Sequence, residues 1–130
     1  MQFEKTHQEF ASVDMHSGWS LPPGYSPESG AAHKILSGGL DELSQRGFRT
    51  RLLRLPAGFH NGEPFVHTYW EEVFLVSGDL WVGNDAQGHG GEEFRPFTFA
   101  CRPPATFHGP FKSIGGCLLL EMHYFGSTDH

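Results

Sequence analysis

Apolar and polar side chains alternate along short segments of this chain, a pattern typical of β-strands. Within residues 71–77, Glu71, Val73 and Leu75 share one side of the predicted strand, and the residues between them share the other. No segment shows a sustained helical spacing of apolar residues. The segments predicted as strands are 31–36, 48–55, 65–68, 71–77, 80–82, 94–101 and 117–125.

Glycine and proline interrupt the chain throughout, with 17 Gly and 9 Pro among 130 residues. Many short strands between turn signals predict an all-β fold of antiparallel strands, closed into a barrel or built of two sheets. Residues 1–30 are rich in turns and weakly patterned, so we expect an extended N-terminal arm followed by one barrel domain over 31–130. Trp19 and Tyr25 would be costly in water, so the arm is expected to pack on the body or on a second subunit.

Composition and charge narrow the range of partners. The formal net charge is −6 and no cluster of lysine and arginine is visible, which argues against nucleic acid or an anionic membrane as partner. No apolar run is long enough to span a bilayer, and no signal peptide is recognisable. Cys101 and Cys117 are expected to be reduced. We therefore expect a soluble, cytoplasmic protein that acts on a small molecule.

Two histidines and a carboxylate on β-type sequence suggest a metal site. His67 and Glu71 lie on the two sides of a tight strand connection, and His108 follows a turn stiffened by Pro103 and Pro104. Such a donor set holds a divalent ion and leaves coordination positions open.

Two alternatives for the ligand set stay open at this point. Strand alternation places Glu71 inward with Val73 and Leu75, but a bulge would replace Glu71 with Glu72. His60, in a loop seven residues before His67, could add a further ligand if the loop folds back.

These residues resemble two motifs of the cupin superfamily. Gly58, His67, Glu71 and Gly78 resemble the first motif, with six residues between the glutamate and the last glycine, and residues 103–108 resemble the second. The closing part of the chain looks like small single-domain bacterial cupins of the RmlC-like type, with some likeness to anti-sigma-factor-type cupin domains. The resemblance implies a double-stranded β-helix, or jelly-roll barrel.

The resemblance also implies a ligand set and one departure from it. His67 corresponds to the second histidine of the family's His-x-His pair, Glu71 to its carboxylate and His108 to its last ligand. Phe65 stands where the family has the first histidine.

The function expected from this set is that of a metal-dependent enzyme, foremost a mononuclear non-haem Fe(II) dioxygenase. Zn, Mn or Ni are the other candidate ions, and an isomerase or decarboxylase that uses Mn or Zn would need the same ligands. A sensor or ligand-binding cupin without catalysis is the alternative from another class. We expect a homodimer, and we expect four residues to line the substrate pocket: Phe65, Arg102, Phe107 and His123.

Overall fold

The computed structural model describes residues 5–126 and consists of strands that form two antiparallel sheets. Its single 3₁₀ turn is η1 (Pro27–Ser29). The strands of the first sheet, in spatial order, are β1 (Ala32–Asp41), β2 (Arg46–Leu55), β9 (Cys117–Tyr124), β4 (Trp70–Gly78) and β7 (Phe99–Arg102). Those of the second sheet are β3 (Phe59–His60), β8 (Phe111–Ser113), β5 (Leu80–Val82) and β6 (Glu92–Phe94).

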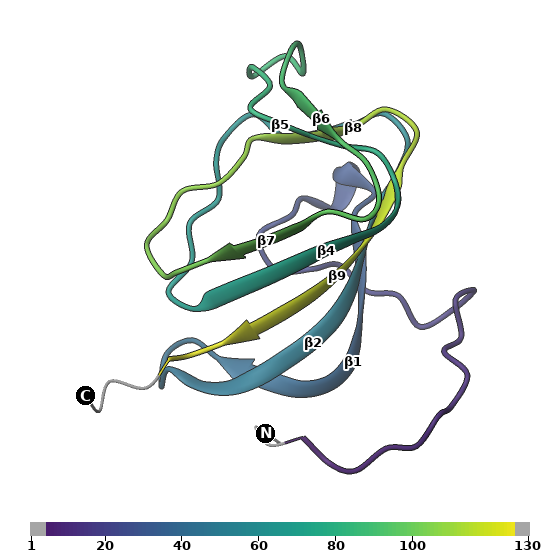
Figure 1. The fold of residues 1–130 in the computed structure, drawn as a ribbon, viewed down its shortest axis with the longest axis vertical. Coiled ribbons are helices and arrows are strands. Elements are labelled where there is room, and N and C mark those ends of the chain that lie inside the picture. Colours follow the sequence, from purple (N-terminus) through teal and green to yellow (C-terminus); the bar gives the residue numbers. More distant parts are fainter. Residues whose placement is uncertain (1–4, 127–130) are drawn as a thin grey trace.

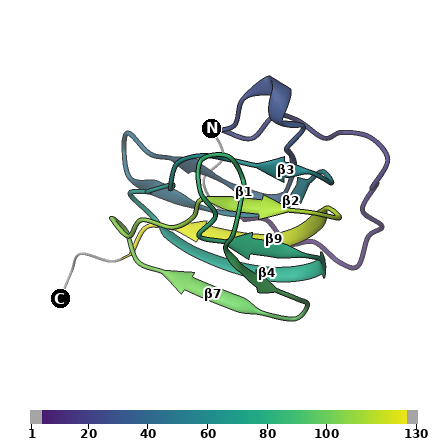
Figure 2. The ribbon, with the colours of Figure 1, turned by 90° about the horizontal axis from the view of Figure 1, so that it is seen from above.

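The two sheets face each other and enclose the core (Figures 1 and 2). In the first sheet, the C-terminal strand β9 lies between β2 and β4, so strands from the start, middle and end of the chain are neighbours. The all-β prediction is confirmed.

Strand β9 contributes every second side chain to the interior of the barrel. Its residues are alternately buried and half-buried, and the buried ones are Cys117, Leu119, Glu121 and His123. The first two join the apolar core, whereas Glu121 and His123 bring polar groups into the same interior. Since buried polar groups need partners, this end of the barrel is expected to hold a polar network.

Strand β1 is longer than the pattern predicted, because it continues through Gly38 and Gly39 instead of ending there. Gly38 has a φ of 79°, and a Cβ at this position would collide with the carbonyl oxygen of Phe48 on β2. The glycine thus allows the two backbones to approach closely beside a bulge between Ile35 and Ser37.

Two further strand predictions were wrong. Residues 65–68 form only an isolated bridge from Phe65 to His108, and residues 94–101 are divided between β6 and β7 by a connection without strand structure. The short strands β3 and β8 were not predicted. Two or three residues are too few to show an alternation of side-chain types.

Residues 5–31 run as an extended arm along the outside of the barrel (Figure 1). The arm joins the body through two backbone hydrogen bonds between Ser20 and His33, one in each direction. The Arg54 guanidinium carbon lies 4.1 Å from the centroid of the Trp19 ring. Tyr25 is half-buried against Phe65, with ring centroids 5.2 Å apart. Within residues 5–126, no helix has the length and apolar character needed to cross a membrane.

Candidate metal centre

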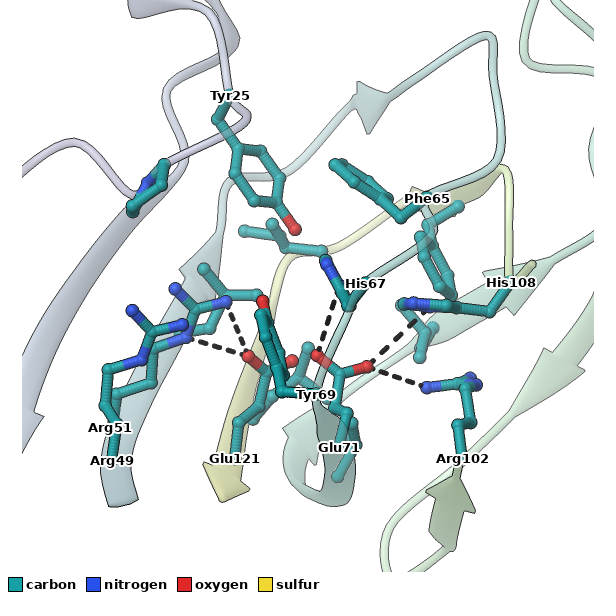
Figure 3. Close-up of a pocket in the computed structure, with 17 residues that line it drawn as sticks. Tyr25, Arg49, Arg51, Phe65, His67, Tyr69, Glu71, Arg102, His108 and Glu121 are labelled. Carbon is teal, nitrogen blue, oxygen red and sulfur yellow. Dashed lines mark hydrogen bonds and ion pairs between the residues drawn. The ribbon is translucent and has the colours of Figure 1, made fainter. Parts of the chain in front are cut away.

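A small chamber lined by both polar and apolar side chains lies between the sheets at the end of the barrel where Glu121 is buried (Figure 3). Its volume is about 40 Å³. Strand β2 contributes Arg49 and Arg51, and the segment before β4 contributes His67 and Tyr69. The other polar lining residues are Tyr25 of the arm, Glu71 of β4, Arg102 of β7, His108 before β8 and Glu121 of β9.

His67, Glu71 and His108 meet in this chamber. His67 Nε2 lies 3.7 Å from one Glu71 oxygen, and His108 Nδ1 lies 3.7 Å from the other. One donor atom from each of the three lies within 4.8 Å of the other two, which is close enough for a shared ion. Two imidazoles and a carboxylate form the donor set that a divalent transition metal accepts.

Backbone pairing between the two motifs explains why the distant histidines converge. The amide of Phe65 donates to the carbonyl of His108 at 2.7 Å, and the amide of His108 donates back to Phe65 at 2.9 Å. The amide of Ala105 also donates to the carbonyl of His67. The imidazole rings of His67 and His108 consequently lie with centroids 4.9 Å apart.

His108 is the clearest sign of an absent ligand. Its side chain is 7% exposed, and both of its ring nitrogens are buried without a hydrogen-bond partner in the described part of the chain. Burial, followed by the charge of Arg102, lowers the pKa of His108 to about 3, so the ring is neutral at pH 7. A buried imidazole without partners loses its hydrogen bonds to water, and a metal ion would restore one such interaction.

His67 is prepared in a similar way. Burial lowers the pKa of His67, which keeps it in the neutral form that coordinates metals. The ring of Tyr69 stacks on it, with centroids 4.5 Å apart and planes 11° from parallel. This stacking holds the imidazole in place at the edge of the chamber.

Two residues orient the carboxylate of Glu71. Arg102 Nη1 donates to one oxygen at 3.1 Å, and His123 Nε2 lies 2.9 Å from the other. A carboxylate offers about four acceptor positions, so these bonds leave room for coordination to an ion. Hydrogen bonds from surrounding groups to a ligating carboxylate are typical of metal sites.

Arg49 determines the tautomer of His123. The guanidinium nitrogens Nε and Nη2 of Arg49 lie 3.0 and 2.8 Å from His123 Nδ1. Because arginine can only donate, Nδ1 accepts and Nε2 carries the proton, which it donates to Glu71. Burial lowers the pKa of His123 to about 3, consistent with a neutral ring.

The same tautomer argues against a second candidate cluster. One donor atom each of Glu71, Glu121 and His123 also lies within 4.8 Å of the others. Coordination by His123 Nε2 would require moving its proton to Nδ1, where it would face the Arg49 guanidinium. We therefore assign His123 as a hydrogen-bond donor to Glu71.

Glu121 is already neutralised by Arg51. Arg51 Nη2 and Nε lie 2.8 and 2.9 Å from one oxygen of Glu121, and both side chains are almost fully buried. Arg51 Nη1 in turn lies 3.0 Å from Nδ1 of His33. This ion pair forms the wall of the chamber beside the metal-binding candidates.

The remaining residues considered from the sequence are distributed as follows. Glu72 lies on the opposite face of β4 from Glu71 and accepts a 2.7 Å hydrogen bond from the Tyr124 hydroxyl. His60 is exposed on β3 and packs beside Gly88, outside the chamber. Strand alternation therefore excludes Glu72 from the chamber. His60 belongs to strand β3 and not to a loop, and it does not approach His67.

Of the four predicted pocket residues, Phe65 and Arg102 line the chamber. His123 is fully buried and lies behind Glu71, where it contacts the carboxylate and not the chamber itself. The prediction for Phe107 was wrong. Phe107 is 70% exposed, because the turn that directs His108 inward leaves the preceding residue on the outside.

Sequence reasoning missed the roles of Arg49, Arg51 and Tyr69. The two arginines are spaced two residues apart on one predicted strand, which places them on one face, but their partners Glu121 and His123 follow about seventy residues later. Tyr25 was expected to pack on the body or on a second subunit, and the structure places it on the body, where it lines the chamber.

Comparison with protein-family models and with curated protein sequences gives no match. Comparison with solved structures gives many. An RmlC-like cupin from Shewanella frigidimarina has a TM-score of 0.65 at 16% identity, over 99% of this chain and 98% of the other. An acetylacetone dioxygenase from Acinetobacter johnsonii has a TM-score of 0.62 at 17% identity, over 95% and 81% of the two chains. The polyketide cyclase RemF from Streptomyces resistomycificus has a TM-score of 0.62 at 17% identity, over 89% and 79%.

These similarities extend over nearly the whole chain and show that it has the RmlC-like cupin fold. The resemblance noted from the sequence motifs is thereby confirmed at the level of the fold. The named proteins include an oxygenase and a cyclase, so the fold alone does not select a reaction.

Proposed function

We propose that the protein is a metal-dependent enzyme for a small molecule, of the mononuclear non-haem Fe(II) dioxygenase type. The observation that carries the proposal is the convergence of His67, Glu71 and His108 around a chamber in which both nitrogens of the buried His108 ring have no partner in the described residues. Two similar folds named as acetylacetone dioxygenases, one of them putative, support the oxidative assignment.

Each residue of the chamber has a distinct task in this proposal. His67, Glu71 and His108 would hold the ion, and an Fe(II) ion bound there would supply open coordination positions for dioxygen and the substrate. His123 and Arg102 fix the orientation of the Glu71 carboxylate. Phe65 and Phe111 provide apolar walls that limit the entry of water.

Oxygen uptake by Fe(II)-loaded protein tests the proposal directly. The protein is loaded without oxygen and then assayed with a panel of small diketones, thiol acids and phenols. We expect consumption of oxygen that depends on substrate and that His108→Ala abolishes. His60→Ala is the matched control, because His60 is an exposed histidine outside the chamber, and we expect it to retain activity.

A non-oxidative reaction with Mn or Zn is the second candidate. The similarity to a polyketide cyclase favours it, since that protein shares the fold. Turnover of a substrate by Zn-loaded protein, without any oxygen uptake by the Fe(II)-loaded form, would replace the dioxygenase assignment with this one.

A further inference from the structure

The chamber is too small to hold an organic substrate. A cavity needs roughly 10–15 Å³ to hold one water molecule, so a chamber of about 40 Å³ has room for about three water-sized groups. An ion and the atoms bound directly to it would fill this space. The body of any substrate must therefore lie elsewhere.

A larger groove begins where the chamber ends. It has a volume of about 370 Å³, within the lower range of small-molecule sites of about 300–1,000 Å³. The groove is lined by residues of β4 and β7 in one sheet and of β5 and β6 in the other. Strands β6 and β7 are edges of their sheets (Figure 1). Four residues line both spaces: Val73, Leu80, Arg102 and Leu119.

The walls of the groove are mostly apolar. Val73, Leu75, Leu80 and Leu119 come from the buried core, and no charged group other than Arg102 and Glu92 lines the groove among residues 5–126. Val82, Phe94 and Ala100 add to the apolar surface along β5, β6 and β7. An aromatic ring or a short aliphatic chain matches this lining.

Arg102 gives the groove a charged end beside the chamber. Its guanidinium has five N–H donors, and within the described residues Glu71 accepts from Nη1 alone. The remaining donors can bind a carboxylate in a bidentate manner. Glu92 also lines the groove, and its carboxylate repels an anionic group. An anionic head group is therefore directed towards Arg102.

We propose that the groove binds the apolar body of the substrate and that Arg102 binds its carboxylate. The ligand class is a monocarboxylate that carries one compact apolar group, with the head group at the junction of groove and chamber. This assignment names the substrate class for the proposed function and rests on it.

Simple probes separate the two parts of this recognition. Benzoate has both the ring and the charge, benzyl alcohol lacks the charge, and acetate lacks the ring. In NMR titrations of the metal-free and the Zn-loaded protein, we expect benzoate to bind about tenfold or more tightly than either partial probe. The methyl resonances of Val82, Leu119 and Val73 should shift with benzoate, because these residues line the groove.

Neighbouring residues on β7 supply a matched pair of variants. Ala100 lines the groove beside its register partner Val73 on β4, whereas Cys101 is exposed on the other face of β7. We expect Ala100→Phe to weaken benzoate binding about tenfold or more by occupying the groove, and Cys101→Phe to change it less than about twofold. Both variants should bind Zn as the parent protein does.

Arg102→Met tests the charged end. In the metal-free protein it should weaken benzoate about tenfold or more and leave benzyl alcohol unchanged, since only the former needs the guanidinium.

Three results would overturn the assignment: benzoate no tighter than acetate, equal benzoate affinity in Ala100→Phe and Cys101→Phe, or shifts confined to methyl groups outside the groove. The proposed function fails separately, by an absence of metal binding. Binding of benzoate to the metal-free protein would then still locate the groove.

Discussion

At the scale of single residues, two histidines that line the chamber differ in role from a third that lies behind Glu71. His67 and His108 present neutral imidazoles to the candidate metal position, whereas His123 has no lone pair available for it. Arg49 causes this difference, because its guanidinium occupies Nδ1 of His123 and forces the proton onto Nε2. Arg49, which coordinates no metal itself, thus determines which of the histidines can coordinate one.

The donor role of His123 is open to test by substitution. His123→Leu removes a hydrogen bond to a buried carboxylate and should lower the free energy of unfolding by about 2–3 kcal/mol. It should also weaken metal binding by about 10–100-fold, as expected when the group that orients a ligand is lost. Urea denaturation and calorimetric titration with Zn measure the two effects.

His123→Gln serves as the control, since an amide N–H can replace the imidazole donor to Glu71. It should recover part of both losses. If His123→Gln were no better than His123→Leu, the hydrogen bond from Nε2 would not be the contribution that matters.

The sequence predicts those features of the candidate metal centre that depend on short-range patterns such as strand alternation. Alternation alone placed Glu71 inward and Glu72 outward, as the structure has them. No short-range pattern shows that Arg49 meets His123 or that Arg51 meets Glu121, because these partners are brought together by the pairing of β2 with β9. The identity of the ligands remains a prediction.

At the scale of elements, the junction between β4 and β5 explains why position 78, seven residues after Glu71, is a glycine. Gly78 ends β4 with a φ of 87°, and a Cβ there would collide with the carbonyl oxygen of Gly116. These backbones approach closely at one end of the β4–β9 pair, and beyond a bulge between Leu75 and Ser77 the same pair places Glu71 opposite His123.

A pair of glycine variants separates backbone strain from collision. Gly83 has a similar φ of 89°, but a Cβ there meets nothing within 4 Å. Gly83→Ala should cost about 1–2 kcal/mol of stability from the left-handed backbone alone. Gly78→Ala should cost clearly more, and equal losses in thermal or urea denaturation would show that the contact with Gly116 is unimportant.

The arm is the element for which the sequence suggested a role in assembly. We propose that the chain forms a homodimer and that residues 1–30 contribute to the contact. Within the described arm, Phe10 is fully exposed and Val13, Met15 and Leu21 are also exposed, which leaves apolar surface for a second copy to cover.

Light scattering tests this proposal. Deletion of residues 1–18 keeps Trp19 and Tyr25, which pack on the barrel, so the fold and the chamber should be retained. We expect the full chain to have the mass of a dimer and the truncated chain that of a monomer. An unchanged mass after truncation would reject the contribution of the arm.

At the scale of the whole molecule, the buried histidines link stability to pH. Burial lowers the pKa of His33 to about 4 and those of His108 and His123 to about 3. Unfolded histidine titrates near a pKa of about 6.5. Below about pH 6.5 the unfolded chain binds protons that the folded chain does not bind. The free energy of unfolding is therefore highest above this pH and decreases as the pH falls.

Urea denaturation of the metal-free protein between about pH 7.5 and pH 4.5 measures this dependence. Three histidines would give a slope of up to about 4 kcal/mol per pH unit within the window. His33→Gln removes one of the three and should make the slope shallower. A flat profile between about pH 6.5 and pH 4.5 would contradict the burial of neutral histidines.

The central claim is that His67, Glu71 and His108 hold one divalent ion. Metal content of the purified protein, determined by elemental analysis after exposure to ferrous, manganous and zinc salts and removal of excess ion, tests it most directly. We expect one ion per chain in the parent protein and in His60→Ala, and none in His67→Ala or His108→Ala, with β-type circular dichroism retained in all four. A folded parent protein that retains none of the three metals, or a His108→Ala protein that retains as much as the parent, would contradict the claim.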